Sequence, residues 1–132
     1  MTQPHRTLHR LIGWDAMQAI LRDFYRRLKS DDRLAPFFAH VTDIDAVATR
    51  IARFWWHDLG GAPRIAGEVF NPHAVHRHFG VTPESVDAWL EVFASTLRDH
   101  LPDDIAAIWL ARAAKFADWT RVEVTRQVPE HR

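Results

Sequence analysis

Apolar residues recur every three or four positions along most of this 132-residue chain, and this spacing constrains the fold more than any other feature. Such a period marks one apolar face on each of several α-helices. No stretch of useful length alternates apolar and polar residues as a half-buried strand does. The four longest periodic stretches begin near Trp14, Ile44, Pro83 and Asp103. The sequence therefore predicts an all-α chain with four principal helices.

Polar, proline and glycine residues mark the ends of these helices. Thr42 or Asp43 can cap the second helix, and the Gly-Gly-Ala-Pro sequence at 60–63 ends it. The third helix opens with Thr-Pro-Glu-Ser at 82–85, which supplies a cap, a proline at the first helical position and an acidic residue in the first turn. Pro-Asp-Asp at 102–104 starts the last helix.

The segments between and beyond the helices complete a single domain over residues 1–132. We expect a flexible N-terminal arm over residues 1–13 and a C-terminal tail over 127–132. The other predicted segments are a break at 30–32, a short segment at 33–40, an irregular loop at 62–71 and a short helix or turn after it.

The composition excludes several classes of partner. Seventeen basic and seventeen acidic side chains give a formal net charge of zero, so neither a nucleic acid nor a membrane surface is expected. No apolar run has the length of a membrane span or the pattern of a signal peptide. Cysteine is absent, which fits a reducing compartment, and we expect a cytoplasmic protein.

Three histidines, His73, His76 and His78, lie close together after the second long helix. One helical turn would place His73 and His76 on one face, and with His78 or His57 they could hold zinc. Structural zinc sites usually include thiolates, however, and no other His or carboxylate cluster in the sequence has ligand spacing. A di-iron bundle needs Glu-x-x-His pairs on facing helices, which the sequence lacks. No motif supports a Ser or Cys nucleophile.

A haem site would combine one of these histidines with the aromatic residues of the chain. A five-coordinate haem needs one neutral imidazole, an apolar slot for the macrocycle and a distal cavity on the other face. Six Trp and eight Phe supply large flat surfaces that can pack on each other or on a planar ligand. His76 can be the iron ligand, and Tyr25 and Trp89 can each donate a hydrogen bond to a distal ligand. The slot could be lined by Phe38, Ile51, Phe54, Phe79, Val81 and Phe93.

In order and spacing, these residues resemble those of the truncated haemoglobins, most closely group III, which fold as a two-over-two helical sandwich. The Phe24-Tyr25 pair is similar to the family's Phe-Tyr pair, whose Tyr hydroxyl points at the distal ligand. Phe38 follows Tyr25 by thirteen positions and falls on the family's haem-packing Phe. Phe54-Trp55 resembles the family's Phe-Trp pair near the end of the next helix.

The proximal part of the resemblance rests on the distance between a histidine and a tryptophan. Trp89 follows His76 by thirteen positions, as the distal Trp of groups II and III follows the proximal His. The interval from His78 is eleven positions and that from His73 is sixteen, so His76 is favoured and His78 is the main alternative. The resemblance spans roughly residues 14–126.

The resemblance also indicates one departure from the family. Group III proteins often carry a His seven residues before the Phe of the Phe-Trp pair, and here that position is Val47, with Ile51 one turn later. The distal helix would then offer no hydrogen-bond donor. Arg50 falls where the family places a basic residue near a haem propionate, and Arg77 is a second candidate. Each could equally be a solvated surface arginine.

The resemblance implies a globin-like domain that binds haem b through His76 and reversibly binds oxygen, nitric oxide or carbon monoxide. Nitric oxide dioxygenase or peroxidase-like chemistry would also be open to such a pocket, and sustained turnover would need an external reductase. The competing class is a haem-free helical interaction module, in which all the aromatic residues are core and the histidines are incidental.

Overall fold

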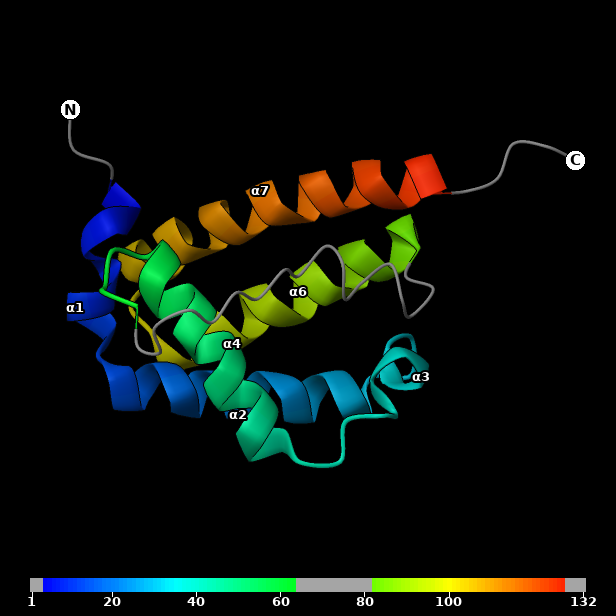
Figure 1. The fold of residues 1–132 in the computed structure, drawn as a ribbon, viewed down its shortest axis with the longest axis horizontal. Coiled ribbons are helices and arrows are strands. Elements are labelled where there is room, and N and C mark those ends of the chain that lie inside the picture. The colour runs from blue at the N-terminus through cyan, green and yellow to red at the C-terminus, as the bar shows by residue number, and fades with distance from the viewer. Residues whose placement is uncertain (1–3, 64–81, 128–132) are drawn as a thin grey trace, which may run out of the picture.

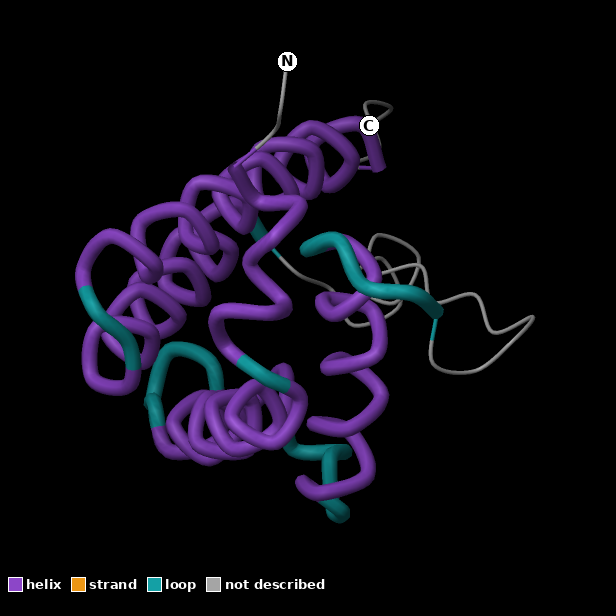
Figure 2. The backbone as a smooth tube through the Cα atoms, turned by 90° about the vertical axis from the view of Figure 1, so that its left-hand side faces the viewer, coloured by secondary structure: helices purple, strands orange, loops and turns teal. Residues whose placement is uncertain are grey.

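The computed structural model describes residues 4–63 and 82–127, and these residues are almost entirely helical (Figure 1). Figure 2 shows helices and connecting loops in the described chain and no strand. The elements are η1 (Pro4–Thr7), α1 (Leu8–Ile12), α2 (Trp14–Ser30), α3 (Ala35–Phe38), α4 (Ile44–Asp58), α6 (Pro83–His100) and α7 (Asp103–Gln127). The prediction of an all-α chain with four principal helices is confirmed.

The four long helices pack as two pairs. The most extensive contacts join α2 to α4 and α6 to α7, and α2 also packs against α6. Figure 1 shows α6 and α7 side by side, with α2 along the other side of α6 and α4 crossing the bundle. Two pairs of helices around one interior are the arrangement expected of a two-over-two sandwich.

Two of the helix starts that the sequence predicted are capped by side chains in the structure. The Asp43 carboxylate accepts a hydrogen bond from the Ala46 backbone N–H at 3.0 Å. At the start of α6, the Thr82 hydroxyl accepts from the Ser85 N–H at 3.1 Å, and the Ser85 hydroxyl accepts from the Thr82 N–H at 2.8 Å. These reciprocal bonds form a capping box, which satisfies two backbone donors that the helix itself leaves unpaired.

The N-terminal residues differ from the flexible arm predicted for residues 1–13. Residues 4–12 are helical, Leu8 is fully buried and Ile12 is nearly so. The Leu59 carbonyl accepts two hydrogen bonds from His9, one from Nδ1–H at 3.0 Å and one from the backbone N–H at 3.3 Å. Two apolar side chains one turn apart and one buried imidazole therefore anchor this segment to the end of α4.

Gly60 allows the N-terminal segment to lie against the end of α4. Its φ is 110°, and a Cβ built on it would lie 1.6 Å from the Arg6 carbonyl oxygen. At Gly61 a Cβ would lie 2.3 Å from Nε1 of the Trp56 indole. Two consecutive residues without a side chain are thus required where α4 meets the N-terminal segment.

Gly60→Ala is expected to lower the free energy of unfolding more than Gly13→Ala does. Gly13 also has a positive φ, of 88°, but a Cβ there would meet nothing within 4 Å. Gly13→Ala should therefore cost only backbone strain, about 1–3 kcal/mol. Gly60→Ala adds a collision with the Arg6 backbone. Urea unfolding followed by circular dichroism measures both, and equal losses would show that the contact with Arg6 is unimportant.

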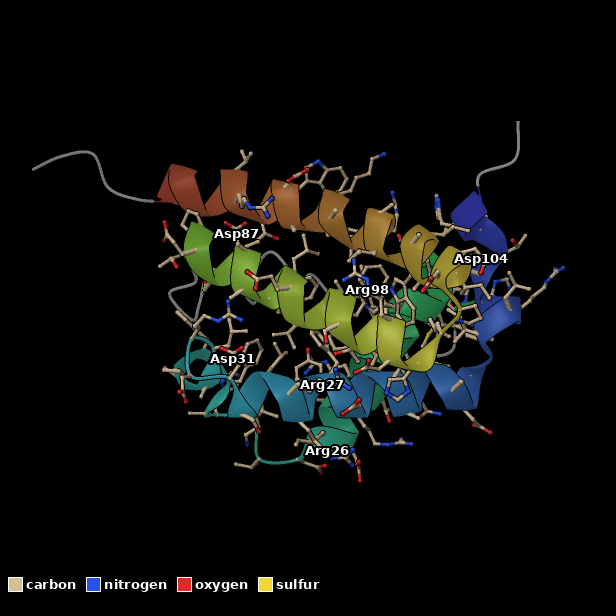
Figure 3. All side chains as sticks on the ribbon, turned by 180° about the vertical axis from the view of Figure 1, so that it is seen from behind. Arg26, Arg27, Asp31, Asp87, Arg98 and Asp104 are labelled. Carbon is tan, nitrogen blue, oxygen red and sulfur yellow. The ribbon has the colours of Figure 1, made fainter. Side chains whose placement is uncertain are left out.

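Ion pairs connect the long helices at the surface. Arg112 on α7 donates to both carboxylate oxygens of Asp58 on α4, at 2.9 and 3.0 Å. Arg27 on α2, labelled in Figure 3, lies 2.8 Å from the Asp99 carboxylate on α6. Each such pair contributes little on its own, so these contacts fix how the helices align rather than supply most of the stability.

A second α2–α6 contact makes stability depend on pH. The His100 imidazole lies 2.8 Å from the Asp23 carboxylate. Burial raises the pKa of Asp23, but hydrogen bonds from His100 and Arg27 outweigh this effect and hold the pKa below its ordinary value. The lowered pKa stabilises the fold above the ordinary pKa of about 3.9, and this stabilisation is lost as the pH falls through the lowered value.

Asp23→Asn should therefore lower the free energy of unfolding by about 1 kcal/mol or less near neutral pH. Below about pH 4 the wild-type carboxylate also becomes protonated. The difference in the free energy of unfolding between Asp23→Asn and the wild type should therefore narrow there. Urea unfolding across this pH range checks both points. Asp32→Asn, at an exposed position, is the control and should leave the profile unchanged. A loss in Asp23→Asn that stays constant down to about pH 2 would contradict the assignment.

Candidate functional site

Tyr25 lies on the buried face of α2, and its side chain is 9% exposed. Its ring contacts Phe24 and Phe38 at centroid distances of 5.6 and 5.9 Å. No hydrogen bond joins its hydroxyl to another described residue.

The protonation state of Tyr25 makes it a hydrogen-bond donor. Burial raises the pKa of its hydroxyl above the ordinary value. A phenol in this environment stays neutral near pH 7 and keeps its O–H proton. Its surroundings therefore keep a protonated donor in an apolar setting, where a hydrogen bond to a small polar ligand is strong.

Trp89 on α6 lies near the same part of the structure. Its indole contacts the Phe24 ring at 5.4 Å and stacks on Phe93 at 5.3 Å, with 21° between the planes. The side chain is half-buried. Tyr25 and Trp89 thus both contact Phe24, so the structure brings the two predicted donors to one aromatic cluster.

The predicted distal residues of α4 share one face of that helix. Val47, Ile51 and Phe54 are spaced by four and three positions and pack, half-buried, against the core. Val47 and Ile51 carry only hydrocarbon side chains, so this face offers packing surface and no hydrogen bond. Arg50 on the same helix is exposed.

Phe93 stands at the centre of the aromatic cluster and is fully buried. Besides Trp89, its ring contacts Phe24 at 4.8 Å, Trp55 at 6.0 Å and Trp109 at 5.5 Å. Offset-stacked and edge-to-face pairs of this kind add about 0.5–1.5 kcal/mol each beyond burial. Phe93 therefore supports the rings that would face a ligand.

These features fit a flat apolar group that carries a small polar ligand. Large apolar side chains, Phe38, Val47, Ile51, Phe54 and Trp89, remain half-buried beside the core, and the Tyr25 hydroxyl has no partner among the described residues. A haem would cover this apolar surface, and a ligand bound to its iron would supply an atom that accepts a hydrogen bond. The described residues therefore fit a haem on its distal side.

The predicted proximal residues lie outside the described residues. They are His76, its alternatives His73 and His78, the haem contacts Phe79 and Val81, and the propionate candidate Arg77. Nothing in the structure tests these assignments, and they stay predictions.

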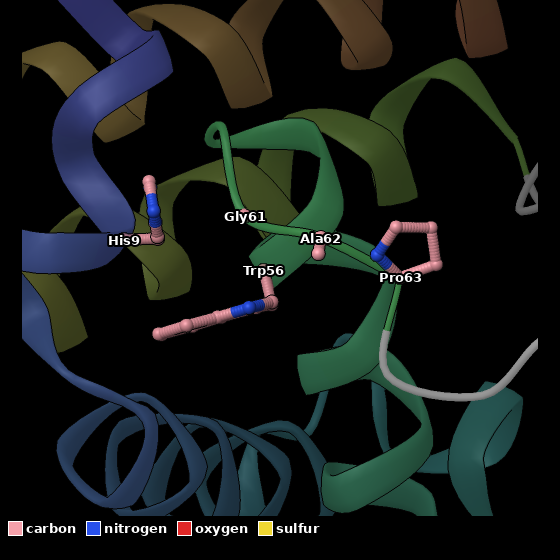
Figure 4. Close-up of a pocket in the computed structure, with 5 residues that line it drawn as sticks. All are labelled: His9, Trp56, Gly61, Ala62 and Pro63. Carbon is pink, nitrogen blue, oxygen red and sulfur yellow. The ribbon is translucent and has the colours of Figure 1, made fainter.

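One pocket in the structure was not anticipated from the sequence. It has a volume of about 380 Å³ and is lined by His9, Trp56, Gly61, Ala62 and Pro63 (Figure 4). The His9 and Trp56 rings meet edge to face at 5.0 Å. The pocket shares no lining residue with the predicted haem site. Its formation depends on the contact of His9 with Leu59, fifty positions away, for which the sequence carries no local signal.

Within residues 4–63 and 82–127, no helix has both the length and the apolar character needed to cross a membrane. The same ranges contain no group of three or more His, Cys, Asp or Glu side chains placed to hold a metal ion.

Comparison with known proteins gives two matches. A family model described as bacterial-like globin matches residues 7–121. A protein of Tetrahymena pyriformis named group 1 truncated hemoglobin is 28% identical over 124 residues, which is 94% of this chain and 98% of that protein. No solved structure matches the chain significantly. The name of this relative refers to group 1, so the resemblance of the chain to group III stays a prediction.

Proposed function

Because this chain belongs to the bacterial-like globin family, it is a haem-binding globin, and we propose that it reversibly binds oxygen, nitric oxide or carbon monoxide at a haem b held by His76. The haem iron supplies an open coordination position for such a ligand. The observation that carries the proposal is the buried Tyr25 hydroxyl, which has no hydrogen-bond partner among the described residues. Buried tyrosines normally have a partner, and the diatomic ligand would supply the missing acceptor.

The distal residues divide into donors and packing groups. Tyr25 donates its O–H to the ligand, and Trp89 offers its indole N–H as a second donor. Their contacts with Phe24 hold both rings in place, so little side-chain freedom is lost when the ligand binds. Val47 and Ile51 add apolar surface and no donor, so among the described residues the proposed donors come from α2 and α6.

The remaining residues would hold the haem itself. Neutral His76 would ligate the iron through Nε2, which requires that this nitrogen carry no proton. Phe38, Phe54, Phe79, Val81 and Phe93 would pack on the macrocycle or support the rings that do. The guanidinium groups of Arg50 and Arg77 suit the negatively charged propionates.

His76→Gly should leave the chain unable to retain haem, because it removes the axial ligand. Adding imidazole to this variant should restore haem binding, which separates loss of the ligand from failure to fold. His73→Ala and His78→Ala are matched controls and should retain haem. Soret absorbance per chain, measured after reconstitution with hemin and desalting, reports all three. Retention in His76→Gly with loss in His78→Ala would move the ligand to His78.

Tyr25→Phe should speed oxygen dissociation by about tenfold, because one hydrogen bond worth about 1–1.5 kcal/mol is lost. Stopped-flow displacement of oxygen measures this rate. Carbon monoxide serves as the control ligand, since it carries less negative charge when bound and should dissociate at a similar rate in both proteins. An unchanged oxygen rate in Tyr25→Phe would mean that this hydroxyl does not contact the ligand.

A further inference from the structure

A continuous series of ring contacts runs from the proposed ligand pocket to the protein surface. We call this series the aromatic ladder, and it consists of Trp89, Phe93, Trp55, Phe116 and Trp119. The successive centroid distances are 5.3, 6.0, 5.6 and 5.5 Å. The series passes from α6 to α4 and then to α7, so it depends on the packing of three helices.

The interior members of the aromatic ladder are shielded from solvent, whereas its Trp119 end is exposed and its Trp89 end is half-buried. Phe93 is completely buried and Trp55 is 4% exposed, whereas Trp119 is 54% exposed. Trp119 is thus a large aromatic side chain at the surface, joined through Phe116 to the interior. Phe54, a proposed haem contact, also touches Phe116 at 5.4 Å and provides a shorter entry.

We propose that the aromatic ladder carries oxidising equivalents from the haem pocket to Trp119, where bulky aromatic one-electron donors are oxidised at the protein surface. This inference rests on the proposed haem function. Electron tunnelling slows steeply with distance, so several short steps between rings in contact are faster than one long step. Indole is far more easily oxidised than the phenyl ring of phenylalanine, and three of the five rings are indoles.

Trp109 and Tyr25 lie in the interior beside the aromatic ladder, and an oxidising equivalent is not easily trapped on either of them. Loss of an electron makes an indole N–H or a phenol O–H strongly acidic, and the radical is trapped where that proton can leave. Trp109 Nε1 is buried without a partner, and the Tyr25 hydroxyl has none among the described residues. Exposed Trp119 can release its proton to water, which makes it the end of the path.

The electrons and protons balance with a peroxide as the oxidant. One hydrogen peroxide takes two electrons and two protons and leaves as two molecules of water. In each of two rounds, Trp119 sends one electron inward and loses its N–H proton to solvent. A phenolic or aryl-amine donor at the surface then returns one electron and one proton to Trp119, and the donor becomes a radical.

The test treats the haem-reconstituted chain with hydrogen peroxide in the presence of a nitroso spin trap and locates the adducts by peptide mass spectrometry. The adduct is expected on Trp119. Trp119→Phe should lose it, and Phe116→Leu, which removes the connecting ring, should weaken it. Trp14→Phe is the matched control, because this half-buried indole contacts Trp56 rather than the aromatic ladder, and should leave the Trp119 adduct unchanged.

Two results would overturn the inference while leaving the haem function intact. One is equal labelling of Trp119 in the haem-free chain, which would show direct attack by peroxide on an exposed side chain. The other is consumption of peroxide by the haem-loaded chain without any Trp119 adduct. A chain that never develops a Soret band with hemin would contradict the proposed function, and the inference with it.

Discussion

Phe93 of α6 contacts an aromatic ring from each of the other three long helices: Phe24 of α2, Trp55 of α4 and Trp109 of α7. It is completely buried, so these contacts are made in the part of the core where dispersion and ring geometry matter most. The two helix pairs also meet where α2 packs on α6 and where Trp55 and Asp58 of α4 contact Phe116 and Arg112 of α7. The rings around Phe93 therefore help to position Trp89 directly and Tyr25 through Phe24.

The polar groups of the pocket are attached to this apolar framework. Tyr25 and Trp89 are both held by Phe24, which itself contacts Phe93. A buried hydroxyl that forms no hydrogen bond with another described residue costs stability, and packing elsewhere offsets that cost. In return, the donor is already oriented when a ligand arrives. The same dense ring contacts that make the core stable also provide short steps for an electron, which links the fold to the proposed oxidation at Trp119.

Much of the fold could be predicted because its signals are local. The spacing of apolar residues predicts the long helices. The neighbouring residues predict Thr82 as one cap and Thr42 or Asp43 as another, and the structure shows Thr82 and Asp43 in these roles. The N-terminal segment was not predicted, because its burial depends on a contact between His9 and Leu59, which are fifty positions apart. Of the site, the structure brings Tyr25 and Trp89 to one cluster. The identity of the proximal ligand depends on residues beyond those described, so His76 stays a prediction.

Binding of haem with an open coordination position is tested most directly by titrating hemin into the purified chain. The ferrous absorption spectrum is then recorded before and after carbon monoxide is added. We expect saturation at one haem per chain, a five-coordinate ferrous spectrum, and a Soret band that shifts sharply with carbon monoxide. A preparation that develops no Soret band, or a ferrous spectrum that carbon monoxide leaves unchanged, would contradict haem-based ligand binding by this chain.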